Sequence, residues 1–243
     1  MLDQVRAELA PTGVLRAGIN LSNFLLVTGK SDAGEPQGVS PSMAAEVARR
    51  LEVGIQYITF KTPGELADAA TEDVWDIGLI GAEPERARHI TFTAAYSEIE
   101  ATYLVPAGSV LQRIADVDQP GIRIAVPARA AFELWLTDNI QHAELHRATG
   151  RQAYEDFVSQ KMDALAGLRA ALVNDMDKLP GSRLLDGQFT AVQQAIGTLK
   201  GRTNAAAFLS EFVEEAKVTG FVSDLINQFG VEGRLTVAPV LTS

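Results

Sequence analysis

Short apolar runs alternate with helical apolar patterns along the first third of the chain. Met43, Val47 and Leu51 recur at helical spacing after Ser40-Pro41, where the serine is expected to cap the helix and the proline to occupy its first turn. Another helix is predicted from Thr62 to about Thr71. Three short apolar runs flank and separate the helices and predict strands: Val14–Ile19, Ile55–Phe60 and Trp75–Gly81. Strands that alternate with helices predict βαβ units and a largely parallel sheet.

The same order of elements recurs after Pro120. Helices are predicted over residues 132–140 and 153–161. The strands that accompany them are Ile122–Val126, Glu144–Ala148 and Asp163–Gly167. In both series an aspartate that follows Trp or Met precedes the small residues of the last strand. Two similar series predict two α/β lobes.

Two extended segments, Thr91–Val105 and Phe189–Thr198, flank the second series and are expected to cross between the lobes. The first lobe would then comprise residues 1–97 and 190–243, and the second residues 98–189. The tail, Ala205–Phe229, has phenylalanines at core-like spacing and predicts a pair of helices. The polar loop Asn20–Gly38 is long enough to suggest a functional role.

Charge and composition exclude several classes of function. The formal net charge of −10 disfavours nucleic acid and anionic lipid surfaces as partners. The absence of cysteine removes thiol nucleophiles and thiolate metal ligands. His142 and His146 have the i, i+4 spacing of a helical zinc site, but the segment reads as a strand, which separates them by roughly 13 Å. We therefore expect no metal, no cofactor and no catalytic centre.

The N-terminal segment, MLDQVRAELAPTG, carries acidic residues and has no long apolar stretch. It predicts neither a signal peptide nor a membrane anchor, and no apolar run elsewhere has the length of a membrane span. The expected location is the periplasm if a signal peptide has been removed, and the cytoplasm otherwise.

Two stretches carry a resemblance to a known family. WDIGLIGAEPERARHITFTAAY, residues 75–96, and the opening LRAGIN with GEPQGVSPSMAAEVARRL are similar to segments of the type 2 periplasmic solute-binding proteins, family 3, which serve polar amino acid ABC transporters. The resemblance covers nearly the whole chain. It implies a two-lobed periplasmic binding protein-like type II fold, a solute held in the cleft between the lobes, an ABC permease as partner, and a monomer.

The resemblance also implies the binding residues. Arg86 matches the arginine that forms a bidentate pair with the ligand carboxylate, and the amides of Gly81 and Ala82 would add neutral donors. In the first loop, Asn20, Asn23 and Phe24 occupy the stretch that supplies polar contacts and an aromatic wall. The alternative for Arg86 is a surface arginine paired with a neighbouring glutamate.

The chain departs from the family pattern in its second lobe. Leu168 stands where an aspartate usually binds the ligand ammonium group, and a leucine cannot neutralise that charge. Arg169 beside it, and Arg129 in the loop that also holds Ala130, add positive charge. The expected ligand is therefore a small anionic metabolite with more than one negative group. The alternative is that the two arginines point outward, to Glu133 or Asp163.

Three other functions stay open at this point. A cyclohexadienyl dehydratase-like lyase uses the same fold and would need a carboxylic acid as proton donor. Glu98, Glu100 and Glu133 are the available candidates. A cytoplasmic ligand sensor, and a pseudo-binding protein that has lost its ligand, are the remaining alternatives.

Overall fold

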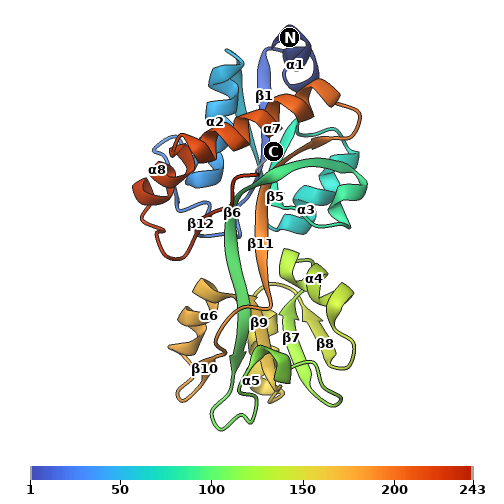
Figure 1. Cartoon of the computed structure of the whole chain (residues 1–243), viewed down its shortest axis with the longest axis vertical. Coiled ribbons are helices and arrows are strands. Elements are labelled where there is room, and N and C mark those ends of the chain that lie inside the picture. The colour runs from blue at the N-terminus through green and yellow to red at the C-terminus, as the bar shows by residue number, and fades with distance from the viewer. Residues whose placement is uncertain (1, 242–243) are drawn as a thin grey trace. The chain divides into compact units, whose positions relative to one another are not determined.

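The computed structural model describes residues 2–241; residue 1 and residues 242–243, which the expected first lobe includes, lie outside the described part. Contacts between Cα atoms divide the chain into two units. Unit 1 comprises Met1–Glu98 and Gln193–Ser243, and unit 2 comprises Ile99–Val192. Strands β6 (Ile90–Val105) and β11 (Thr190–Leu199) each continue from one unit into the other (Figure 1).

The sheet of unit 1 has the strand order β4-β1-β5-β11-β6. Its first three strands are parallel neighbours: β1 (Val14–Asn20), β4 (Gly54–Phe60) and β5 (Ile77–Gly81). Strand β5 is buried along its whole length, as its continuous apolar run predicts. Within it Gly78 leaves room for the side chains of Leu66 and Trp75, so this glycine serves packing.

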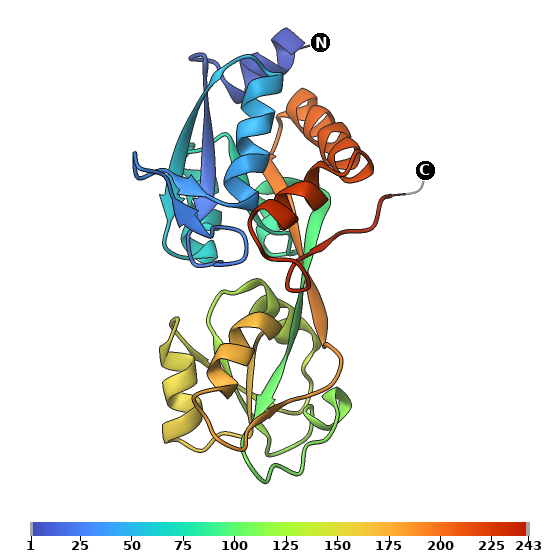
Figure 2. The ribbon, with the colours of Figure 1, turned by 90° about the vertical axis from the view of Figure 1, so that its left-hand side faces the viewer.

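Helices from both ends of the chain build unit 1. They are α1 (Leu2–Leu9), α2 (Val39–Arg50), α3 (Pro63–Asp68), α7 (Thr203–Val218) and α8 (Phe221–Gln228). The blue N-terminal segment and the orange-to-red C-terminal helices belong to this one unit (Figure 2). The Glu8 carboxylate accepts hydrogen bonds from the amide of Ala205, at 2.7 Å, and the side chain of Asn204, at 2.6 Å. Helix α1 is thereby tied to the start of α7.

The predicted start of α2 is wrong in its details. The helix begins at Val39 with Gly38 at the N-cap, and no side chain caps it. Ser40 lies inside the first turn, where its hydroxyl is 2.8 Å from the hydroxyl of Tyr96. The serine thus serves a tertiary hydrogen bond, which local sequence does not indicate.

The sheet of unit 2 has the order β6-β9-β7-β8. Its parallel strands are β7 (Arg123–Pro127), β8 (Glu144–Ala148) and β9 (Ala164–Leu168). The helices are α4 (Ala131–Asn139), α5 (Gln152–Ser159) and α6 (Arg169–Met176), of which the sequence pattern did not predict α6. Short strands complete the fold: β2 (Gly29–Lys30), β3 (Pro36–Gln37), β10 (Arg183–Leu184) and β12 (Thr236–Val237).

The repeat seen in the sequence appears as the same junction in both units. In unit 1 the amide of Arg16 donates to the Asp76 carboxylate at 3.0 Å, and the amide of Asp76 donates to the Arg16 carbonyl at 2.8 Å. In unit 2 Arg123 and Asp163 exchange the same two bonds, at 2.8 and 3.1 Å. An aspartate before the last parallel strand therefore fixes that strand to the first one.

Asp76 is fully buried and carries two guanidinium partners. Arg16 donates to its carboxylate through Nε at 2.9 Å and Nη2 at 2.8 Å, and Arg202 donates through Nη1 at 3.0 Å. A buried carboxylate is tolerated only when its oxygens are paired in this way.

Replacing Asp76 by asparagine should lower the free energy of unfolding by about 3–5 kcal/mol, because it removes the buried negative charge that pairs with the two partly buried arginines. Asp73 is the matched control, since it contacts the same arginines but is 69% exposed. Asp73→Asn should cost less than about 1 kcal/mol. Urea denaturation followed by circular dichroism measures both, and equal losses would contradict a special role for Asp76.

Candidate ligand-binding site

The carboxyl ends of β1 and β5 lie side by side in unit 1. The two strands are parallel and pair Ile19 with Leu79, so their last residues, Asn20 and Gly81, reach the same edge of the sheet. Ligands of open α/β sheets bind beyond the carboxyl ends of the strands. This edge is therefore the candidate site of unit 1.

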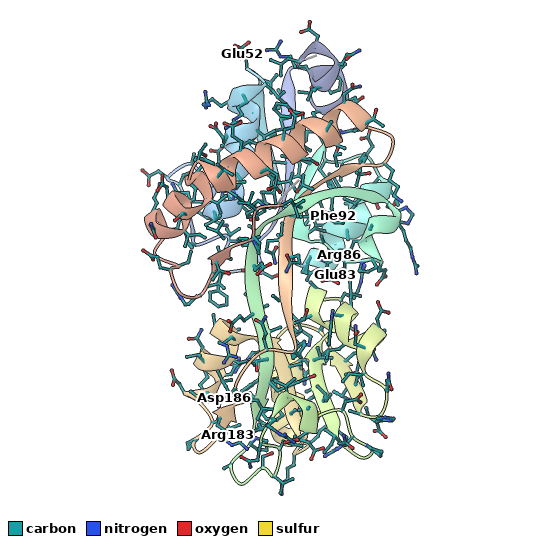
Figure 3. The ribbon with its side chains drawn as sticks, in the orientation of Figure 1. Glu52, Glu83, Arg86, Phe92, Arg183 and Asp186 are labelled. Carbon is teal, nitrogen blue, oxygen red and sulfur yellow. The ribbon has the colours of Figure 1, made fainter. Side chains whose placement is uncertain are left out.

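Arg86 lies just beyond this edge, in the 3-10 turn Arg86–Arg88, and only 5% of it is exposed. Its Nη1 donates to the carbonyl of Gly81 at 2.8 Å, which holds the guanidinium against the end of β5. Figure 3 labels Arg86 and Glu83, which belong to the turn after this strand. Arg86 is thus buried rather than at the surface.

The backbone of Gly81 and Ala82 is used within the unit. Gly81 offers its carbonyl to Arg86, and the amide of Ala82 donates to the carbonyl of Gln193 in β11 at 2.8 Å. We expected the amide of Ala82 to donate to the ligand. In the structure this amide instead donates to a carbonyl of β11. Gly81 acts as the residue that orients Arg86.

The asparagines of the first loop shape the loop itself. The side-chain oxygen of Asn20 accepts hydrogen bonds from the amide and the hydroxyl of Ser22, at 3.1 and 2.8 Å. Asn23 is buried, and its side-chain oxygen accepts from the amide of Leu25 at 3.2 Å. Both are turns in which the side chain replaces a backbone acceptor. Phe24, which follows Asn23, is 38% exposed, and its role as an aromatic wall stays a prediction.

Tyr96 belongs to the support of the site rather than to its surface. It is fully buried, and burial raises the pKa of its phenol well above the usual range. Its hydrogen bond to Ser40 links β6 to α2.

Unit 2 presents a comparable edge. Parallel pairing of Ala125 with Leu165 brings the carboxyl ends of β7 and β9 side by side. Arg129 and Ala130 follow β7, and Arg129 is exposed with a left-handed backbone, φ 62°. Leu168 closes β9, and the side chain that would bind an ammonium group is absent there.

Arg169 is engaged by its own unit. Its Nε donates to the carboxylate of Glu100, from β6, at 2.6 Å, and its Nη2 donates to the carbonyl of Gly187. The alternative expected Arg169 to point outward to Glu133 or Asp163, but its carboxylate partner is Glu100. The positive charge of Arg169 is therefore balanced by Glu100.

Two of the three acids considered as proton donors, Glu100 and Glu133, have other partners. Glu100 pairs with Arg169, and the buried Glu133 accepts hydrogen bonds from Arg147 and Thr137. Over residues 2–241 no cluster of three or more metal-ligating side chains occurs. His146 lies in β8, with its Nε2 2.8 Å from an oxygen of Asp156.

The sequence profile of the bacterial extracellular solute-binding proteins, family 3, matches residues 18–232. The chain belongs to this family. Membership confirms the two-lobed α/β class that the sequence predicted and supports a binding protein over an enzyme. Among the described residues, no helix combines the length and apolar character that crossing a membrane requires.

Solved structures with the same fold have low sequence identity to the chain. A mutant of ArgBP from T. maritima has a TM-score of 0.72 at 19% identity, covering 94% of this chain and 100% of its own. A putative ABC transporter binding component from Wolinella succinogenes, complexed with lysine, has 0.73 at 19%, covering 91% and 97%. The ancestral amino acid-binding protein AncCDT-1, a precursor of cyclohexadienyl dehydratase, has 0.71 at 18%, covering 94% and 98%. No curated protein matches the sequence.

Gly38 fixes the end of the first loop against α2 and should not tolerate a side chain. Its φ is 148°, and a Cβ there would lie 2.3 Å from the carbonyl oxygen of Leu26. Gly38→Ala should destabilise unit 1 by about 1–3 kcal/mol, because the new Cβ would collide with backbone atoms of Leu26 and Val27 in addition to the strain of a positive φ. Gly34 also has a positive φ but open space around it, so Gly34→Ala separates strain from collision. Thermal unfolding measures both, and equal shifts would contradict the collision.

Proposed function

We propose that this family member binds a small solute through a carboxylate that pairs with Arg86. The supporting observation is that Arg86 is buried at the carboxyl edge of the unit 1 sheet with one guanidinium nitrogen anchored to Gly81. Such an arginine is oriented in advance and loses little side-chain entropy when it binds a planar carboxylate.

The second part of the proposal is that the solute carries a further negative group. Leu168 offers no charge to an ammonium ion at the edge of unit 2, whereas Arg129 is an exposed cation there. Burying an ammonium group without a charged partner would weaken binding by several kcal/mol. This cost disfavours a standard α-amino acid as the solute.

A cationic or neutral amino acid is the second candidate. Glu100 places a carboxylate on the strand beside Leu168, since Ala101 pairs with Leu168. If a ligand ammonium displaced Arg169 from Glu100, this acid would replace the missing aspartate. The ancestral protein and the lysine complex described above bind amino acids, which favours keeping this candidate in the test.

We further propose that the protein acts as a monomer outside the cytoplasm and delivers its solute to an ABC permease. The family comprises extracellular solute-binding proteins, which supports this role.

Arg86→Ala should abolish most binding while the fold persists, because a lost buried ion pair costs about 2–5 kcal/mol. Arg88→Ala is the matched control, since Arg88 belongs to the same 3-10 turn but is exposed. Calorimetry with the solute found in the screen below measures both variants. Wild-type affinity in Arg86→Ala would show that another residue is the anchor.

A thermal-shift screen should favour succinate and glutarate over butyrate, glutamine, lysine and arginine, because Leu168 cannot pair with an ammonium group. Mass spectrometry after incubation should recover the bound solute unchanged. Stabilisation by lysine or arginine alone would support the amino acid candidate. Steady formation of a product would instead indicate an enzyme.

A further inference from the structure

Residues 235–241 follow α8 and bring β12 beside β6 (Figure 1). The two strands are antiparallel and pair Thr236 with Glu98 and Val237 with Ser97. The hydroxyl of Thr236 also donates to the carbonyl of Glu98 at 3.3 Å. Because unit 1 leaves β6 at Glu98, this segment holds the strand at the last residues that belong to unit 1.

A buried lysine of α7 fastens the same segment. The Nζ of Lys217 donates to the carbonyl of Pro239 at 2.8 Å. It also lies 2.8 Å from Oε1 of Glu214, an ion pair without the geometry of a hydrogen bond, and the Lys217 side chain is fully buried. The other oxygen of Glu214 accepts from the amide of Leu241 at 3.1 Å. Hydrogen bonds to buried charges are among the stronger ones, so this lysine is the main attachment outside the strand pairing.

The pairing leaves a short stretch of β6 between its supports in the two units. Pairs with β12 end at Glu98, and pairs with β9 begin at Ala101. Only Ile99 and Glu100 lie between these two residues, where β6 passes from unit 1 into unit 2. Bending between compact units is usually absorbed by a few residues of this kind. The pairing with β12 therefore sets where that stretch begins.

One feature of the pairing opposes it. Ser97 is fully buried, and among residues 2–241 its hydroxyl has no hydrogen-bond partner. The amide of Ala238 donates to the carbonyl of Tyr96 at 3.2 Å, so Ser97 and Val237 form a non-hydrogen-bonded pair with closely spaced side chains. The hydroxyl thus lies opposite an apolar side chain. A buried hydroxyl without a partner destabilises the state that buries it.

We propose that residues 235–241 form a latch that limits the bending of β6 where the strand leaves unit 1. With the latch closed, bending is confined to Ile99 and Glu100. With the latch released, it extends back to Ser97. Lys217 favours the closed latch and the Ser97 hydroxyl opposes it, which allows the latch to open without unfolding unit 1. The inference concerns the strand alone and does not depend on which solute the protein binds.

Lys217→Met keeps the apolar stem of the side chain and removes its charge. Hydrogen exchange of the Ala238 and Ile99 amides, followed by nuclear magnetic resonance, should become roughly tenfold faster, because a hydrogen bond from a buried charge is lost. Arg50→Met is the matched control, since Arg50 pairs with Glu215 on the same helix but is not bonded to the latch. It should lower thermal stability and leave both exchange rates unchanged. Equal exchange in the two variants would contradict the fastening by Lys217.

Ser97→Ala should act in the opposite direction. It removes the unpartnered hydroxyl and leaves an apolar contact with Val237, so exchange of the Ala238 amide should become slower than in the wild type. Faster exchange would show that the hydroxyl supports the latch instead of opposing it.

A disulfide across the pair tests the latch in one protein. The chain has no cysteine, so Ser97→Cys combined with Val237→Cys introduces two thiols that can pair with each other. Directly opposed residues of a non-hydrogen-bonded pair have the spacing that a disulfide requires. Exchange of the Ile99 amide should be severalfold slower in the oxidised form than in the reduced form. The amide of Asp163 in unit 2, which donates to the Arg123 carbonyl, is the internal reference and should not change.

The Ile99 amide decides between a latch and a local contact, because β12 does not pair with Ile99. If oxidation slows exchange at Ala238 but not at Ile99, residues 235–241 only cover the strand and the proposal is wrong. Failure of the two thiols to form a disulfide would contradict the pairing on which it rests.

Discussion

The buried carboxylate of Asp76 is the interaction on which the arrangement of unit 1 depends. It joins Arg16 of β1 and Arg202, which precedes α7, at the entrance to β5. Because β1 and β5 are parallel, fixing their entrances also fixes where they end. The carboxyl edge with Asn20, Gly81 and Arg86 therefore inherits its geometry from an ion cluster at the opposite end of the strands.

The aspartate that joins the first and last parallel strands has guanidinium partners in unit 1 but bonds to the arginine backbone in unit 2. In unit 2 Asp163 makes the reciprocal backbone bonds with Arg123, but that arginine's side chain donates to the carbonyls of Gln160 and Lys161 rather than to the carboxylate. In unit 2 the buried carboxylate of Glu133 also accepts a hydrogen bond from the amide of Arg129, in the loop after β7, at 2.9 Å. Buried carboxylates thus support the candidate binding residues in both units: Asp76 precedes its strand in unit 1, and Glu133 follows its strand in unit 2.

Most of the elements could be predicted from the chain, because their apolar periodicity is local. Strand β8 starts and ends where the pattern placed it, at Glu144 and Ala148, and β1 extends the prediction by one residue, to Asn20. Helix α6 was not predicted, because its apolar residues do not lie on one face and no side chain caps its N-terminus. Arg86 was selected as a binding residue from a motif, and that role stays a prediction. The engagement of Arg169 by Glu100 could not, because the two residues are 69 positions apart and only strand pairing brings them together.

Unit 1 is built from both ends of the chain, whereas unit 2 is one continuous segment, and this has a consequence for biosynthesis. A ribosome delivers all of residues 99–192 before Arg202 and helices α7 and α8 emerge. Since contiguous units fold as they are released, unit 2 is complete while β1 and β5 still lack one partner of Asp76. The apolar surface of β1 and β5 therefore stays exposed until α7 and α8 have been synthesised. Chaperone dependence and loss to proteolysis during synthesis should accordingly concentrate on the N-terminal third of the chain.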